Sequence, residues 1–141
     1  MFPVRGDDAV FAYKVDPATG AMAPVNGSPF EAGDVPLYAA ADPSGKFLYV
    51  TNAFSSDLSA FTIDLNTGSL ASIAGSPFSA GGAPIALAVD PSTDFLFVTR
   101  SDSTMFIYRV GSTGGLSVIA GSPFGPTGTE PRAIAIVGML E

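Results

Sequence analysis

The sequence contains no cysteine and no histidine. Without cysteine the chain cannot form disulfides, thiolate metal sites or a cysteine nucleophile. Without histidine it lacks the side chain that titrates nearest neutral pH, so a Ser-His-Asp triad is excluded. A zinc site is excluded as well, because carboxylates alone suit Ca²⁺ or Mg²⁺. We therefore predict no catalytic residue, no metal and no cofactor.

Charged residues are also scarce. They make up 13% of the chain, about half of the usual share of roughly 25%, and they leave a net charge of −7. This charge argues against partners such as nucleic acid or anionic membranes, which bind basic surfaces. No apolar run is long enough to span a bilayer, and residues 1–6 lack a signal-peptide pattern. The low charge and the many Ser, Thr and Gly residues favour an extracellular or cell-surface location.

What the sequence does contain is an internal repeat. Gly-Ser-Pro-Phe occurs at 27–30, 75–78 and 121–124, and its starts lie 48 and 46 residues apart. A proline recurs at 36, 84 and 131, and Asp-Pro-Ser occurs at 42–44 and 90–92. A period in the forties with strand-like segments is typical of β-propeller blades.

The middle copy predicts four strands, at 37–41, 46–52, 58–64 and 69–74. Asp-Pro-Ser-Gly at 42–45 and Asn-Thr-Gly at 66–68 supply turn residues between them. Residues 47–50 are apolar at every position, as expected for a strand covered on both faces. The many glycines and prolines leave no room for useful helices.

The repeat is cut out of phase. We predict a partial blade at 1–35, complete blades at 36–83 and 84–130, and the first strand of a closing blade at 131–141. Aligning Phe2-Pro3-Val4-Arg5 with Phe97-Val98-Thr99-Arg100 makes residues 1–5 the end of a second strand. The fold class is therefore an all-β propeller with about three four-stranded blades per chain.

The unmatched strands predict that several chains complete one ring. The last strand of one chain would complete the first blade of the next, and this exchange would hide the open sheet edges. Twofold symmetry is the commonest closure, so a six-bladed homodimer is favoured over a nine-bladed homotrimer. The alternative is that the sequence is a piece of a longer propeller. The closure residues are Phe2, Val4, Ile134, Ile136 and Val137.

Leu48-Tyr49-Val50-Thr51-Asn52, which follows Asp-Pro-Ser-Gly-Lys, resembles the YVTN-type β-propeller repeat. The chain is also similar to 6-phosphogluconolactonase-like propellers. In that family a Gly-Pro-Arg-His string opens a blade, and a Glu follows the Val-x-Asn of the next strand. Here Pro131-Arg132 is followed by Ala133, and Ala53 stands where the resemblance places the Glu. Of the three functional residues that the resemblance implies, the chain has only the arginine.

Arginine side chains are expected at one mouth of the channel. In each blade, the start of the first strand and the end of the second strand lie at the same rim of the propeller, because adjacent strands run antiparallel. A small anion or carboxylate is the ligand that such residues would bind. Ion pairs with neighbouring acids are the simpler alternative. The candidate ligand-binding residues are Arg132, Arg100, Arg5 and Asn52.

Three functions remain open at this stage. A non-catalytic binding or scaffold propeller that assembles by strand exchange is favoured, because His and Glu are missing from the lactonase positions. The second is a degenerate hydrolase of sugar lactones that uses Arg132 and a carboxylate. The third is a propeller fragment, natural or designed, without activity of its own. The expected partners are further copies of the chain and a small anionic ligand at the channel mouth.

Overall fold

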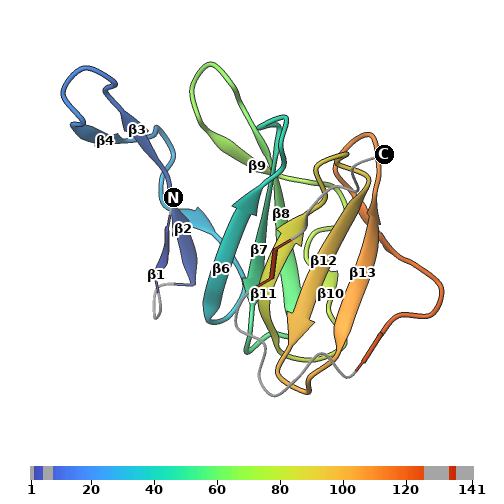
Figure 1. The fold of residues 1–141 in the computed structure, drawn as a ribbon. Coiled ribbons are helices and arrows are strands. Elements are labelled where there is room, and N and C mark those ends of the chain that lie inside the picture. The colour runs from blue at the N-terminus through green and yellow to red at the C-terminus, as the bar shows by residue number, and fades with distance from the viewer. Residues whose placement is uncertain (1, 5–7, 126–133, 136–141) are drawn as a thin grey trace.

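The computed structural model describes residues 2–4, 8–125 and 134–135. Within these residues the chain forms fourteen strands and no helix. The strands group into three successive blades, which do not close on one another (Figure 1). The prediction of an all-β partial propeller is therefore confirmed. No helix in the described part of the chain could span a membrane.

The middle blade contains β6 (Pro36–Ala41), β7 (Phe47–Asn52), β8 (Asp57–Ile63) and β9 (Leu70–Ser72). Each strand pairs antiparallel with the one before it, as in a four-stranded meander. The predicted strands agree with these bounds to within a residue or two. A short fifth strand, β10 (Phe78–Ser79), pairs with the start of β8 and was not predicted from the sequence.

The third blade repeats this arrangement with β11 (Pro84–Val89), β12 (Phe95–Arg100), β13 (Met105–Val110) and β14 (Leu116–Val118). Its register matches that of the middle blade, since Pro84 lies opposite Arg100 as Pro36 lies opposite Asn52. In both blades the register shifts just after the proline, where the first strand bulges. The two blades are therefore equivalent strand by strand.

Among the described residues, the N-terminal blade lacks the first strand that β6 and β11 provide in the other two blades. It contains β1 (Phe2–Val4), β2 (Ala9–Phe11), β3 (Tyr13–Val15), β4 (Met22–Pro24) and β5 (Phe30–Glu31). The single third strand predicted here is divided into β2 and β3 at Ala12. The β3–β4 hairpin forms a separate sheet and projects away from the other blades (Figure 1).

The Gly-Ser-Pro-Phe repeat ties the end of each blade to its own third strand. The serine hydroxyl accepts a hydrogen bond from a backbone N–H in the middle of that strand: Ser28 from Ala12, Ser76 from Ala60 and Ser122 from Ile107, each at 2.9–3.0 Å. The following Ser–Pro bond is cis in all three copies. The phenylalanine then pairs with the start of the third strand. The repeated string is thus structural.

The Asp-Pro-Ser-Gly turn is built around the carboxylate of Asp42. This side chain is buried and accepts hydrogen bonds from the backbone N–H groups of Ser44, Lys46 and Phe47, as well as from the Ser44 hydroxyl. Burial raises the pKa of Asp42, but these hydrogen bonds outweigh it and hold the pKa below its usual range. In the third blade, the carboxylate of Asp90 accepts hydrogen bonds from the backbone N–H and the hydroxyl of Ser92.

Replacing Asp42 with alanine is expected to lower the free energy of unfolding by about 1–3 kcal/mol, because three backbone N–H groups of the turn lose the buried carboxylate that accepts their hydrogen bonds. Asp90→Ala is the matched control and should cost less, since Asp90 accepts fewer bonds. Because the pKa of Asp42 is lowered on folding, its contribution exists above about pH 4 and is lost as the pH falls through the folded value. Urea unfolding at neutral and acidic pH measures both effects. Equal losses for the two variants would contradict the assignment.

Two apolar clusters hold the blades together. One contains Val10 of the N-terminal blade with Leu48, Val50, Phe61 and Leu70 of the middle blade. The other joins the opposite face of the middle blade to the third blade; it contains Tyr49, Leu58, Ala60, Ile73, Leu87, Leu96, Val98, Tyr108 and Val110. The middle blade is therefore covered on both faces, as its apolar second strand predicted.

The predicted closure residues are only partly described. Phe2 and Val4 lie in β1, which pairs with β2 as the remnant of a second strand should. Ile134 is half-buried and is not part of a strand. Ile136 and Val137 lie outside the described residues. Strand exchange between chains therefore stays a prediction.

Candidate functional site

The candidate site lies at the ends of two equivalent second strands. Asn52 is the last residue of β7 and Arg100 is the last residue of β12. Each lies opposite the proline that opens the first strand of its blade. Both side chains are buried, although their polar groups are among the costliest to remove from water. The structure therefore places two of the four predicted ligand residues at equivalent positions of neighbouring blades.

The amide of Asn52 is held in one orientation. Its Nδ2 donates to Asp57 Oδ1 at 2.7 Å and to Ser59 Oγ at 2.9 Å. Asp57 also accepts a hydrogen bond from the hydroxyl of Ser55. The Oδ1 atom of Asn52 is buried and has no hydrogen-bond partner among the described residues. Because both N–H groups are engaged, the atom left for a ligand is an acceptor.

The guanidinium of Arg100 is held from three sides. Its Nη2 donates to Asp102 Oδ2 at 2.5 Å and to the Gly81 carbonyl at 3.0 Å. Its Cζ lies 4.9 Å from the centre of the Phe106 ring, within cation–π distance. The ion pair with Asp102 bears out, for this residue, the expectation that the arginines pair with neighbouring acids. Nε is buried and has no hydrogen-bond partner in the described part of the chain.

Two glycines make room for these side chains. A β-carbon on Gly33 would lie 2.6 Å from Asn52 Nδ2, and one on Gly82 would lie 2.6 Å from Arg100 Nη2. Contacts this short do not occur, so any side chain at either glycine would displace the polar group beside it. Neither glycine was predicted from the sequence to contact these side chains. The sequence marks their role only by a proline that follows closely, in Gly-x-x-Pro at 33–36 and in Gly-x-Pro at 82–84.

The acids around Arg100 are poor bases. Hydrogen bonds from Thr104, together with the charge of Arg100, lower the pKa of Asp102 below its usual range against the effect of burial. Tyr108, whose ring lies 5.9 Å from that of Phe106, has its pKa raised to about 12 by burial. Its hydroxyl donates to the Ser79 carbonyl at 2.6 Å. None of these groups has a pKa near 7, which is the range that suits a general base at neutral pH.

The two unpartnered atoms are of opposite kind, since Nε of Arg100 is a hydrogen-bond donor and Oδ1 of Asn52 is an acceptor. Nε of Arg100 suits a carbonyl, carboxylate or phosphate oxygen. Oδ1 of Asn52 suits a hydroxyl group. Within the described residues no three acidic side chains gather as a metal site would require.

Arg5 and Arg132 lie outside the described residues. Within β1, Val4 lies opposite Ala9, as Asn52 lies opposite Asp57, so Val4 occupies the position that Asn52 fills in the middle blade. For the residues of β1, the alignment with the third blade is therefore shifted by one residue. The pairing shows the cause: Thr51 pairs with Leu58 in the middle blade, whereas the equivalent Thr99 pairs with Met105, which is one residue nearer along the chain.

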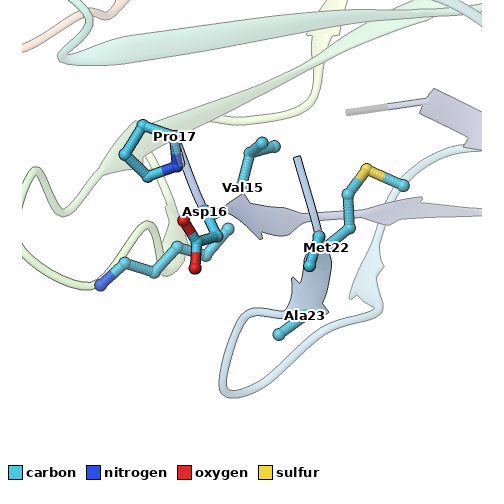
Figure 2. A pocket seen from close by; sticks show the side chains of 7 residues that line it. Val15, Asp16, Pro17, Met22 and Ala23 are labelled. Carbon is cyan, nitrogen blue, oxygen red and sulfur yellow. The ribbon is translucent and has the colours of Figure 1, made fainter. Parts of the chain in front are cut away.

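A cavity lies elsewhere, against the β3–β4 hairpin. It has a volume of about 490 Å³ and is lined by Lys14, Val15, Asp16, Pro17, Ala21, Met22 and Ala23. Figure 2 shows Val15 and Met22 on the same side of the hairpin, where they pair across the two strands. No cluster of polar groups converges there, and this face is uncovered where the other two blades are covered. The predicted ligand residues Asn52 and Arg100 do not line this cavity.

Comparison with known proteins supports the propeller architecture. The family model described as "Lactonase, 7-bladed beta-propeller" matches residues 2–138. No curated protein matches the chain significantly.

Several solved structures share the fold. A proposed 6-phosphogluconolactonase from Bacteroides fragilis is 20% identical with a TM-score of 0.76, over 89% of this chain and 35% of that one. One from Bacteroides uniformis is 22% identical with a TM-score of 0.77, over 92% and 38%. A periplasmic gluconolactonase from Pseudomonas aeruginosa is 24% identical with a TM-score of 0.74, over 91% and 38%. The chain thus spans little more than a third of the length of these structures.

Proposed function

Because the chain belongs to the lactonase family of seven-bladed β-propellers, we propose that it forms part of a propeller that binds and hydrolyses sugar lactones. The proposal rests on one observation in particular. The rim of the propeller carries a buried acceptor on Asn52 and a buried donor on Arg100 that have no partner among the described residues. The structural relatives from Bacteroides fragilis and Pseudomonas aeruginosa are described as a proposed 6-phosphogluconolactonase and a periplasmic gluconolactonase.

A sugar lactone has the groups that the rim requires. Its ring carbonyl can accept a hydrogen bond from Nε of Arg100, and its hydroxyl groups can donate to Oδ1 of Asn52. During hydrolysis the carbonyl oxygen becomes an oxyanion, which a fixed guanidinium stabilises more strongly than the neutral carbonyl. The product is a sugar acid whose carboxylate is again an acceptor for arginine.

A second candidate function is binding without catalysis. The whole chain lacks histidine, and Asp102 is a weak base because its pKa is lowered. Ala53 and Ala133 stand at two positions where the resemblance implies functional side chains. In this case the same rim would retain a sugar acid or another hydroxylated anion and leave it unchanged.

We expect the full chain to speed the hydrolysis of glucono-δ-lactone above its spontaneous rate and to be stabilised thermally by gluconate. Binding to the native state raises the melting temperature through mass action. Both effects should be lost in Arg100→Lys, which keeps the charge but removes Nε. They should also be lost in Gly82→Ala, which keeps Arg100 but displaces its guanidinium. Acid release and melting temperature are the measurements.

Arg109→Lys is the matched control, because Arg109 is exposed and lies over Phe95 in the same blade. It should leave hydrolysis and stabilisation unchanged. Stabilisation by gluconate without any hydrolysis would support the binding function instead. If neither effect occurs, or if both persist in Arg100→Lys and Gly82→Ala, the rim is not the site.

A further inference from the structure

A second cavity lies between the N-terminal blade and the middle blade, and we call it the inter-blade cavity. It has a volume of about 170 Å³. One wall is the link that leaves the N-terminal blade, and the other is formed by β8, β9 and the second Gly-Ser-Pro-Phe segment. Its polar lining comes from Glu31, Ser59, Ser72 and Ser76, and Phe61 supplies an apolar wall. The function proposed above does not use this cavity.

The equivalent space is filled at the junction between the middle and third blades. Ser59 pairs with Val50 of β7. Its equivalent in the third blade is Phe106, which pairs with Val98 of β12. A β-carbon on Gly81 would lie 3.0 Å from Phe106 Cζ, so this ring packs directly against the link that leaves the middle blade. A phenylalanine therefore occupies the place that the serine leaves open.

The rest of the lining differs between the two junctions in the same direction. Gly33, the equivalent of Gly81 by its distance from the blade-opening proline, lines the inter-blade cavity. Ser72 pairs with Phe61 as Val118 pairs with Tyr108, so a serine again stands where the third blade has an apolar side chain. Two replacements by serine thus exchange apolar packing for a cavity with polar walls. A cavity of this kind holds water or a polar ligand.

The hydroxyl of Ser59 carries an unused hydrogen-bond donor. Ser59 is only 5% exposed. Its Oγ accepts a hydrogen bond from Asn52 Nδ2 at 2.9 Å, and among the described residues it donates to no acceptor. A buried donor without an acceptor costs free energy. Because Ser59 lines the cavity, the occupant that relieves this cost is one that accepts a hydrogen bond there.

The other lining groups define the chemistry of the occupant further. The ionised carboxylate of Glu31 accepts hydrogen bonds and donates none, so the occupant must also carry donors. Among the described residues that line the cavity, none is a lysine or arginine, so an anion would meet only the negative charge of Glu31. Hydroxyl groups both donate and accept. A volume of about 170 Å³ lies below the usual range for drug-sized ligands, roughly 300–1,000 Å³, and suits a molecule the size of a monosaccharide.

We propose that the inter-blade cavity binds a neutral polyhydroxy molecule, a sugar or sugar alcohol of monosaccharide size. Ser59 donates to one ligand hydroxyl and Glu31 accepts from another, while the ring of Phe61 packs against the carbon skeleton. This site differs in charge from the rim, where Arg100 favours an anion. Its occupation does not depend on lactone hydrolysis. The hydrogen bond between Ser59 and Asn52 nevertheless joins the cavity to the rim.

Titration of the full chain with xylitol and with glucose, followed by amide NMR shifts, tests the proposal with an open-chain and a ring-shaped probe. At least one probe should give saturable shifts at the residues that line the cavity. Ser59→Ala removes the donor, and Ser72→Val introduces the valine of the third blade and narrows the space. Each should raise the Kd at least about tenfold. Ser117→Ala is the matched control, because this serine is exposed on β14 and does not line the cavity, so the Kd should be unchanged.

The absence of saturable shifts with both probes would overturn the proposal and leave the cavity to water. Shifts centred on Gly82 and Arg100 would overturn it too, because the probe would then occupy the rim. An unchanged Kd in both cavity variants has the same meaning. Circular dichroism confirms that each variant is folded, and Ser72→Val tests the cavity without removing the bond to Asn52. If gluconate fails to bind while a neutral probe shifts the cavity residues, the function proposed for the rim fails and this site stands.

Discussion

The free energy of unfolding is expected to fall by about 2–5 kcal/mol when Gly114 is replaced by alanine. Gly114 has φ +84°, where a residue with a β-carbon costs about 1–2 kcal/mol. The new methyl group would also lie 2.5 Å from a ring carbon of Phe47 and 2.7 Å from Ile73 Cδ1. Relieving this overlap means moving packed side chains of the middle blade, which typically costs a further 1–3 kcal/mol, roughly. Urea unfolding of the full chain measures the loss.

Gly20→Ala separates the two causes. Gly20 has φ +73° at the equivalent turn, but no described atom lies within 4 Å of its β-carbon. This variant should therefore lose only the backbone contribution, about 1–2 kcal/mol. Equal losses for Gly114→Ala and Gly20→Ala would show that the turn of the third blade does not pack against the middle blade.

The repeat made the architecture predictable, because each blade is a local unit with its own turn residues. The four strands of the middle blade follow from apolar runs that the turn sequences Asp-Pro-Ser-Gly and Asn-Thr-Gly separate from one another. The short strand β10 was missed because it is only two residues long and follows a cis Ser–Pro bond. No apolar alternation marks such a strand. The serine of Gly-Ser-Pro-Phe likewise gave no sign that it would accept a hydrogen bond from a strand sixteen residues earlier.

The candidate site was predictable only in part. Antiparallel pairing brings second-strand ends to the rim, so Arg100 and Asn52 could be named from the sequence. The sequence does not reveal which polar atoms stay unpaired, because that depends on the bonds of Nδ2 to Asp57 and Ser59. Gly33 and Gly82 matter through distances to side chains that are remote in sequence. Such contacts exist only once the link between blades has folded over the rim.

The register of β1 shows how a repeat can mislead. Residue identity aligns 2–5 with 97–100, but the pairing of the second strand with the third differs by one residue between these blades. In a strand, a shift of one residue moves every side chain to the other face. The backbone pairing of Val4 with Ala9 therefore decides the matter in a way that residue identity cannot.

Leu58→Ala is expected to lower the free energy of unfolding by about 2–5 kcal/mol. Leu58 is completely buried in the cluster that joins the middle blade to the third blade. On its strand it lies opposite Thr51 in β7 and Phe78 in β10, so it also anchors the short strand that closes the blade. Removing its three outer carbons leaves a cavity between two sheets, each of which is held by its own strand pairing. Sheets held in this way move little into the cavity, so we expect the loss of unfolding free energy to lie toward the upper part of this range.

The matched control is Leu65→Ala in the same blade. Leu65 is 66% exposed beside the Asn-Thr-Gly turn, so its truncation should change stability by no more than about 0.5 kcal/mol. Amide hydrogen exchange gives a second measurement. If Leu58 joins the blades, its truncation should speed exchange in β12 and β13 of the third blade as well as in β8. Faster exchange confined to β8 and β10 would mean that each blade is stable by itself, and that the shared apolar cluster does not couple them.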